Sequence, residues 1–258
     1  MDQNQPTKNN TETANQIKDL QEQLNSTESK RHRRIINITT ELPNQNAYTL
    51  ALNDEFKHVA FDEVRAPKNK GQWRQLMNLN EGAPLDVEIG TGNGTHFAWY
   101  AKQNSTHGLV GLELKYKPLI QTIRRVVQDG AQNAMICRYH AFNIDELFAD
   151  GEINKLMIYF PDPWTSPHKP KNRVVNRHNL EIFHRLQRPG SIIDFKTDSR
   201  EYFLWALEEI AASPYYKIIF QTFNLHQSEI AAENFKTQFE NIFLRQGIEI
   251  NFVRLERV

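Results

Sequence analysis

Residues 86–94 read Asp-Val-Glu-Ile-Gly-Thr-Gly-Asn-Gly, an apolar segment that runs into three glycines spaced G-x-G-x-G. A helical pattern follows from Thr95, so this stretch predicts a strand, a tight turn and a helix. Gly90, Gly92 and Gly94 let the backbone turn sharply and approach a ligand that a Cβ atom would push away. We therefore expect these glycines to bind a cofactor.

The acidic residues beside this loop indicate which cofactor it binds. The dinucleotide fingerprint reads G-x-G-x-x-G and rests a pyrophosphate on the helix N-terminus. Here Glu88 precedes the first glycine by two residues, where a carboxylate repels pyrophosphate but suits a cationic sulfonium or ammonium group. Glu113 ends the next predicted strand, about twenty residues after the glycines, where a ribose diol is bound in nucleoside-binding α/β folds. Together these features predict a site for S-adenosylmethionine; a solvent-exposed turn with incidental acids is the alternative.

From residue 85 onward, short apolar runs alternate with longer segments of helical periodicity. This alternation is typical of βαβ units, in which helices cover a parallel sheet. It predicts an α/β fold with a doubly wound, mostly parallel, seven-stranded sheet of the Rossmann-like kind. The expected strands are 85–89, 109–113, 134–139, 155–160, 191–196, 217–222 and 249–255. The expected helices are 95–103, 116–129, 144–148, 177–187, 199–211 and 229–246. Whether the last two strands are parallel or form an antiparallel edge pair is left open.

Composition bounds the rest of the chain. The 258 residues carry 31 Lys and Arg against 31 Asp and Glu, so any nucleic-acid contact has to come from local patches. Residues 1–34 predict a disordered polar tail that ends in the basic cluster 30–34, whereas 35–258 predict one catalytic domain. There is no apolar run for a membrane span or a secretory signal, and the single Cys137 permits no internal disulfide. We expect a cytoplasmic protein without a metal; monomer and homodimer both remain open.

A second motif stands at the end of the fourth predicted strand. Residues 157–164 read Met-Ile-Tyr-Phe-Pro-Asp-Pro-Trp, so Asp162 lies between two prolines and precedes Trp164. Because proline fixes the backbone on both sides, the carboxylate is expected to point into the crevice beyond the strand's carboxyl end. A rigid turn that packs Trp164 onto the core is the structural alternative.

In combination, the motifs of this chain resemble those of the bacterial tRNA (guanine-N7)-methyltransferases. The resemblance covers about residues 85 to 247 and includes, in order, 88–94, 159–164, 188–190, 196–198 and 237–240. It implies a class I methyltransferase fold and the transfer of a methyl group from S-adenosylmethionine to a variable-loop guanine of tRNA, which yields 7-methylguanosine.

The resemblance also assigns residues. It implies that Glu88, Glu113 and Asp162 bind the cofactor, and that Asp198, Thr237 and Glu240 bind the substrate. Two positions depart from the family pattern. His140-Ala141 replaces an Asp, or an Asn followed by Ala, at the adenine, with Asn143 nearby as a substitute. Ser166 replaces the expected substrate lysine.

The basic segment after Trp164 is thinner than in the family. We expect it to contact tRNA phosphates, which would make binding salt dependent. Its expected phosphate contacts are Lys169, Lys171, Arg173 and Arg177.

Guanine N7 carries a lone pair and no proton, so its methylation needs no general base and depends on positioning. We expect Asp162 to act in catalysis by placing the acceptor beside the methyl group, and Asp198 to select guanine. Trp164 packs either against the flipped base or within the core or a lid.

Two other functions stay open: methylation of an exocyclic amine, and a catalytically weakened tRNA-binding or partner-binding protein on the same fold. The glycine spacing disfavours a nicotinamide oxidoreductase.

Overall fold

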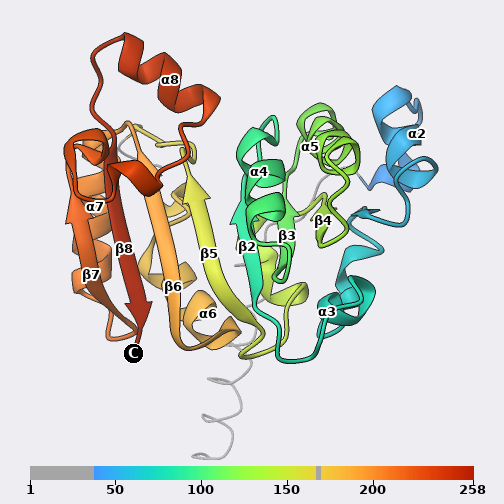
Figure 1. Cartoon of the computed structure of the whole chain (residues 1–258), viewed down its shortest axis with the longest axis horizontal. Coiled ribbons are helices and arrows are strands. Elements are labelled where there is room, and N and C mark those ends of the chain that lie inside the picture. The colour runs from blue at the N-terminus through green and yellow to red at the C-terminus, as the bar shows by residue number, and fades with distance from the viewer. Residues whose placement is uncertain (1–37, 167–169) are drawn as a thin grey trace, which may run out of the picture. The chain divides into compact units, whose positions relative to one another are not determined.

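A computed structural model describes residues 38–166 and 170–258. It contains a mixed eight-stranded sheet with the order β1-β4-β3-β2-β5-β6-β8-β7 (Figure 1). The strands are β1 (Ala60–Phe61), β2 (Leu85–Ile89), β3 (Gly108–Leu112), β4 (Ala134–Cys137), β5 (Ile153–Tyr159), β6 (Gln187–Thr197), β7 (Tyr216–Thr222) and β8 (Asn251–Arg257). The predicted doubly wound α/β fold is confirmed. The predicted number of seven strands is wrong, because the two-residue strand β1 pairs with β4 and is too short to leave a periodic pattern.

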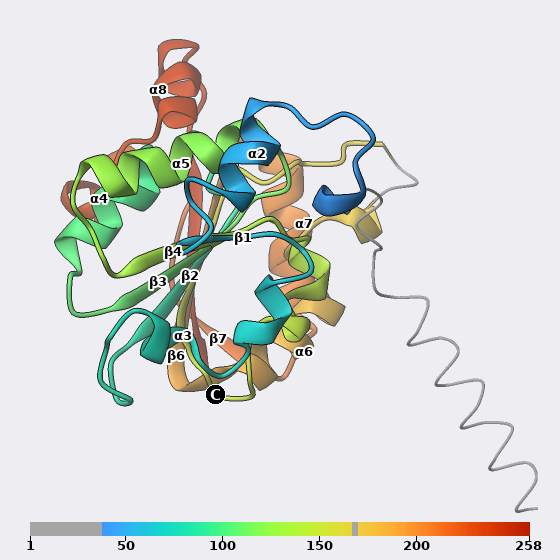
Figure 2. The ribbon, with the colours of Figure 1, turned by 90° about the vertical axis from the view of Figure 1, so that its right-hand side faces the viewer.

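Helices cover both faces of the sheet. In Figure 2, α2 (Ala47–Asn53), α4 (Thr95–Gln103) and α5 (Tyr116–Gln128) lie on one face, and α6 (Arg177–Leu186) and α7 (Arg200–Ala211) on the other. The remaining helices are α3 (Trp73–Leu76) and α8 (Gln238–Arg245). Each face has its own core: Phe97, Leu119 and Met157 belong to one cluster, and Phe183 and Phe195 to the other. None of the described helices is long and apolar enough to cross a bilayer.

Short 3-10 helices complete the described elements. They are η1 (Thr39–Glu41), η2 (Ala66–Asn69), η3 (Ala141–Glu146), η4 (Pro170–Asn172), η5 (Leu225–Gln227) and η6 (Ala231–Glu233). Two predicted helices are corrected here. The segment expected at 144–148 is η3, and the long helix expected at 229–246 is η6 followed by α8. Residues 234–237 separate η6 from α8, which begins at Gln238 with Thr237 as its N-cap.

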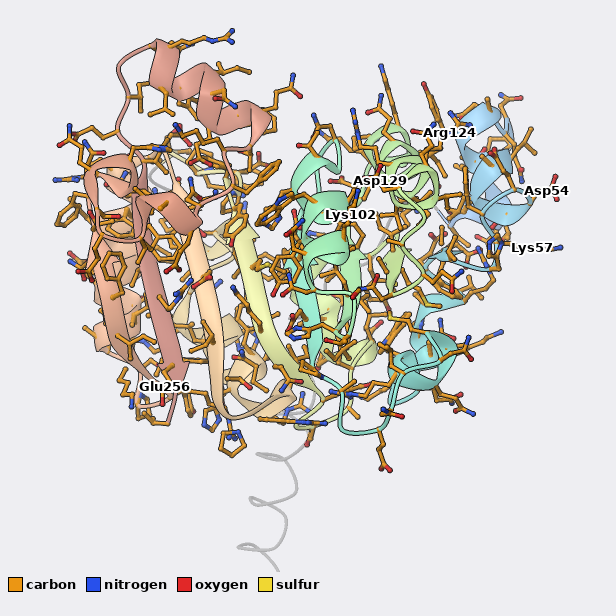
Figure 3. All side chains as sticks on the ribbon, in the orientation of Figure 1. Asp54, Lys57, Lys102, Arg124, Asp129 and Glu256 are labelled. Carbon is orange, nitrogen blue, oxygen red and sulfur yellow. The ribbon has the colours of Figure 1, made fainter. Side chains whose placement is uncertain are left out.

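The last two strands form the antiparallel end of the sheet. β8 pairs antiparallel with both β6 and β7, and it places Arg254 opposite Asp194. The Arg254 Nε and Nη2 atoms donate to the two carboxylate oxygens of Asp194 at 2.6 and 2.9 Å. Near the C-terminal end of β8, the Oε1 atom of Glu256 (labelled in Figure 3) lies 3.1 Å from the Nζ atom of Lys217 in β7. The last two strands are thus an antiparallel edge pair, which settles the choice that the sequence left open. The cross-strand charge pairs lie in register across these strands.

The parallel strands bring distant loops to one edge. β2 pairs in parallel with β3 and β5, β3 with β4, and β5 with β6, so these five strands end at the same side of the sheet. In both views α8 also lies beyond this edge (Figures 1 and 2). The loops that carry the predicted site residues therefore meet here, as expected for ligand sites in open α/β sheets.

Candidate active site

The glycine loop after β2 adopts a conformation that glycine favours. Gly90, Gly92 and Gly94 have φ values of 81°, 55° and 78°. A Cβ atom on Gly94 would lie 2.5 Å from the Thr122 backbone, whereas one on Gly90 would meet no atom within 4 Å. Gly94 is thus required by the packing of the loop on α5. Gly90 instead leaves open space at the end of β2.

Glu113 lies directly beside this loop. Its Oε2 accepts a hydrogen bond from the Gly92 backbone N–H at 3.2 Å, and its Oε1 accepts one from Lys115 N–H at 2.9 Å. Burial raises the pKa of the Glu113 carboxyl group, and these backbone N–H groups oppose that rise. The structure therefore brings Glu113, the residue predicted to bind the ribose, next to the glycine loop. Backbone N–H donors orient its carboxylate.

Glu88 is more deeply buried than the sequence indicated. Its Oε2 lies 2.8 Å from His96 Nδ1, and both side chains are nearly inaccessible. The His96 ring packs edge-on against Tyr159 at the end of β5, with 4.9 Å between centroids. His96 is not among the residues predicted from the sequence, although its place in the first turn of α4, directly after the glycine loop, puts it within reach of the strand end. In this structure the Glu88 carboxylate is thus joined to α4.

His140 follows β4 and begins η3. Its Nδ1 accepts a hydrogen bond from the Phe142 backbone N–H at 3.2 Å, which orients the ring. Asn143, the expected substitute at the adenine, is buried within η3. The structure therefore places His140 at the common edge of the sheet, and Asn143 inside the element that His140 caps.

Asp162 lies in an unusual loop after β5. Its side chain is exposed, and two bulky residues with left-handed backbone conformations flank it: Phe160 with φ 52° and Trp164 with φ 44°. Such conformations persist only where surrounding contacts enforce them. One of these contacts is the hydrogen bond from Phe160 N–H to the Lys196 carbonyl of β6, at 2.8 Å. The loop thus has a defined shape that presents Asp162 at the edge of the sheet.

Asp198 follows the end of β6 and is half-buried. Burial raises the pKa of its carboxyl group. Asp162 and Asp198 therefore extend from two neighbouring parallel strands at the same edge. Carboxylates at this edge suit a cationic or hydrogen-bond-donating ligand.

Thr237 and Glu240 form the N-terminal capping box of α8. The Thr237 Oγ1 accepts from Glu240 N–H at 3.2 Å, and Glu240 Oε2 accepts from Thr237 N–H at 3.3 Å. Glu240 is fully buried, and its Oε2 lies 2.7 Å from Lys196 Nζ of β6. The structure thus places Glu240 between α8 and the sheet, away from the surface. The T-x-x-E spacing is a capping-box pattern and marks this helix start in the sequence.

Comparison with known proteins identifies the family. A family model described as "Putative methyltransferase" matches residues 82–253. A tRNA (guanine-N(7)-)-methyltransferase of Bdellovibrio bacteriovorus is 63% identical over 210 residues, which cover 81% of this chain and all of the relative. The chain belongs to this methyltransferase family. A second tRNA (guanine-N(7)-)-methyltransferase, from Listeria monocytogenes, is 31% identical over 72% of this chain and 86% of its own length.

A solved structure supports the fold. The crystal structure of the 16S rRNA methyltransferase KamB matches with a TM-score of 0.51 and 14% identity, and the match covers 72% of this chain and 91% of that one. The class I methyltransferase fold expected from the sequence is therefore confirmed.

In this family member, the basic segment after Trp164 is divided between surface and core. Lys171 in η4 and Ser166 are exposed, and so is Arg177 at the start of α6. Lys169 lies outside the described residues. Arg173 is buried, with a side chain only 3% exposed beside Glu201. The structure thus brings Lys171 and Ser166 to the surface and places Arg173 inside.

Helix α8 supplies neighbours of the glycine loop that sequence analysis did not identify. The Asn93 side chain donates to Gln238 Oε1, and the Phe239 ring lies 4.0 Å from the position of a Cβ atom on Gly92. Phe239 is 56% exposed, although Gln238 and Glu240 on either side of it are both tethered. This methyltransferase therefore holds an exposed aromatic ring over its glycine loop. Phe239 is one of several apolar residues in the predicted helix 229–246, and no distinctive sequence pattern marks it.

Proposed function

We propose that the protein transfers a methyl group from S-adenosylmethionine to N7 of a guanine in the variable loop of tRNA. The observation that carries this proposal is the contact between Glu113 and the glycine loop, within a member of the tRNA (guanine-N(7)-)-methyltransferase family. A carboxylate on the loop that follows β3 suits the ribose diol, and the open space at Gly90 leaves room for a ligand at the end of β2. These residues fit the cofactor. When bound, S-adenosylmethionine supplies a methyl group on a positively charged sulfur.

The cofactor-binding residues then divide as follows. Gly90, Gly92 and Gly94 shape the loop, and Glu113 accepts hydrogen bonds from the ribose hydroxyls. Glu88 contributes negative charge near the methionine end, with His96 holding its carboxylate in place. His140 borders the adenine. We assign Asp162 to face both ligands, and its exposure on a constrained loop supports this role.

The chemistry requires positioning and electrostatics. N7 has no proton to lose, so this chain needs no general base there. Methylation leaves a positive charge on the purine, which a nearby carboxylate stabilises. We assign Asp162 to hold the acceptor against the methyl group, and Asp198 to accept hydrogen bonds from the N1 and N2 edge of guanine.

The proposed tRNA contacts within the described residues are exposed. Lys171 contacts phosphates, Ser166 borders the bound tRNA, and Phe239 offers a ring on which the flipped base can stack. Lys169, which lies outside the described residues, is assigned to phosphates from its place in the basic segment alone. Thr237 and Glu240 act by holding the first turn of α8, and Glu240 does so through Lys196. The proposed cellular location is the cytoplasm.

Incubation with labelled S-adenosylmethionine and an unmodified tRNA transcript tests the proposal. We expect 7-methylguanosine at one variable-loop position after nuclease digestion and mass spectrometry. Replacement of that guanine by adenine in the transcript should abolish incorporation. Methyl groups on an exocyclic amine, or none at all, would contradict the assignment.

Calorimetry tests the cofactor site separately from catalysis. Glu113→Ala should abolish measurable binding of S-adenosylmethionine, because the ribose loses its acceptor. Retained tRNA binding without any cofactor binding by the wild-type protein would favour the non-catalytic alternative.

A further inference from the structure

The loop that presents Asp162 is anchored on both sides. On the upstream side, Phe160 N–H donates to the Lys196 carbonyl at 2.8 Å. On the downstream side, the Pro163 carbonyl accepts a hydrogen bond from Arg173 Nε, also at 2.8 Å. Prolines 161 and 163 have no N–H to donate, so the loop has few other ways to hold its shape. These two anchors therefore define where the Asp162 carboxylate lies.

The downstream anchor is itself held firmly in the core. The Arg173 guanidinium lies over the rings of Tyr202 and Trp205, at 5.1 and 5.0 Å from their centroids. Its Nη2 pairs with Glu201 Oε1, and its side chain is only 3% exposed. Helix α7 thus supplies all three of these partners. An arginine held in this way can aim a hydrogen bond, but it is closed to a tRNA phosphate.

We infer that Arg173 is a positioning residue, which clamps the Pro163 carbonyl and so holds Asp162 in its catalytic orientation. This inference rests on the proposed function, in which Asp162 places the acceptor beside the methyl group. The strained backbone at Phe160 and Trp164 supplies the physical reason, because a left-handed conformation at a bulky residue relaxes once its enforcing contact is lost. Arg173 accordingly affects the rate of methyl transfer, and not the electrostatic attraction of tRNA.

The test compares Arg173→Met with Lys171→Met, a substitution at an exposed lysine two residues away. Two quantities are measured for each variant. The first is kcat at saturating tRNA, and the second is the slope of the logarithm of the tRNA association constant against the logarithm of the salt concentration. Activities are taken per folded molecule, at a temperature where denaturation curves show each variant fully folded. We expect Arg173→Met to lower kcat by about ten- to a hundred-fold, as for a misplaced catalytic group, with the wild-type salt slope. Lys171→Met should reduce the salt slope by about 0.7 to 0.9, the value for one lost phosphate contact.

Two further variants keep the inference testable if Arg173→Met does not fold. Arg173→Lys retains the positive charge and an N–H donor for the Pro163 carbonyl. Its kcat should therefore lie between those of the wild-type protein and Arg173→Met. Glu201→Gln alters the partner on the solvent side and should lower kcat more weakly, again without a change of salt slope. A reduced salt slope with wild-type kcat in an Arg173 variant would overturn the inference and make Arg173 a phosphate contact. Failure of the proposed function is a different result, namely a wild-type protein that forms no 7-methylguanosine.

Discussion

Two glycines of the same loop serve different purposes. Gly94 has no room for a side chain, because a Cβ atom would overlap the Thr122 backbone at 2.5 Å. Gly90 has a similar positive φ but faces open space, so in this structure backbone strain alone opposes a side chain there, and the proposed cofactor would add to it. Sequence spacing predicted both as members of one loop. It could not separate packing from ligand access, because that depends on α5, which lies further along the chain.

Alanine substitutions at Gly90, Gly94 and Gly130 separate backbone strain, steric overlap and ligand access. Gly90→Ala and Gly130→Ala should each lower the free energy of unfolding by about 1–2 kcal/mol, the cost of a left-handed alanine. Gly130 has φ 72°, faces open space and lies at the end of α5, so it is a matched control. Only Gly90→Ala should also weaken S-adenosylmethionine binding in calorimetry. Equal cofactor affinity in the two variants would contradict a ligand at Gly90.

Gly94→Ala should be the most destabilising of the set, because steric overlap with the Thr122 backbone adds to the strain. Urea denaturation measures the difference from Gly130→Ala directly. A loss no larger than that of Gly130→Ala would show that the loop and α5 can separate without cost.

Helix α8 connects the loops at the carboxyl edge of the sheet. Gln238 contacts Asn93 of the glycine loop, Glu240 pairs with Lys196 of β6, and Phe243 packs against Phe160 before the Asp162 loop, at 5.7 Å between centroids. The T-x-x-E pattern marks the start of this helix in the sequence. The partners of the helix come from three distant segments, so only the folded chain brings them together.

A double-mutant cycle measures the buried link between α8 and β6. Burial lowers the pKa of Lys196, and Glu240 opposes that effect. Lys196→Met should cost about 3–5 kcal/mol of unfolding free energy, because it removes the ammonium group 2.7 Å from the buried Glu240 carboxylate, which keeps only the neutral amide of Asn234 and the ring of His226 beside its other oxygen. The double variant with Glu240→Gln should lose less than the sum of the single losses. As a control, Lys217→Met in the exposed Lys217–Glu256 pair should change stability by about 0–1 kcal/mol.

The segment between α4 and β3 is linked to strand β2 by a histidine–carboxylate pair. His107 Nδ1 lies 2.8 Å from Asp86 Oδ2, which also accepts from the Tyr100 hydroxyl at 2.9 Å. The hydrogen bond to Asp86 raises the pKa of His107 above its ordinary value of 6.5. The protonated ring therefore contributes stability that is fully present below that value and is lost as pH rises through the raised pKa.

His107→Gln tests this link. The variant should be less stable than the wild-type protein at about pH 5.5, and the difference should shrink by about pH 9. Urea denaturation at both values measures it. A difference that grows with pH would contradict the assigned direction.

For the whole molecule, the charge balance is zero, with 31 cationic and 31 anionic side chains. Any electrostatic attraction of tRNA therefore has to come from local groups. One candidate is the cluster 30–34, which contains four Lys and Arg residues and lies outside the described part of the chain. Thr39, close to the start of the described residues, is hydrogen-bonded to the folded domain. Its Oγ1 lies 3.0 Å from both Glu63 Oε2 and the Tyr116 hydroxyl. Composition predicts a domain boundary between these two segments, after residue 34.

Deletion of residues 1–34 tests this boundary. The shortened protein should keep its unfolding free energy within about 0.5 kcal/mol and its cofactor affinity, because the contacts of Thr39 remain. Its tRNA affinity should fall most at low salt, since cations are removed. Deletion of 1–41 should instead lower the melting temperature. Loss of folding after the shorter deletion would show that the boundary lies earlier.

The sequence alone determined the α/β class, the strand and helix alternation, the glycine loop with Glu113, and the family. These features are local, because periodicity, turn residues and motif spacing are written in consecutive residues. Only the tertiary structure decided that Arg173 and Glu240 are buried, that His96 joins Glu88, and that Phe239 covers Gly92. Each of these outcomes depends on contacts between segments far apart in the chain. Burial and pairing of a charged side chain follow from such contacts, and no local pattern encodes them.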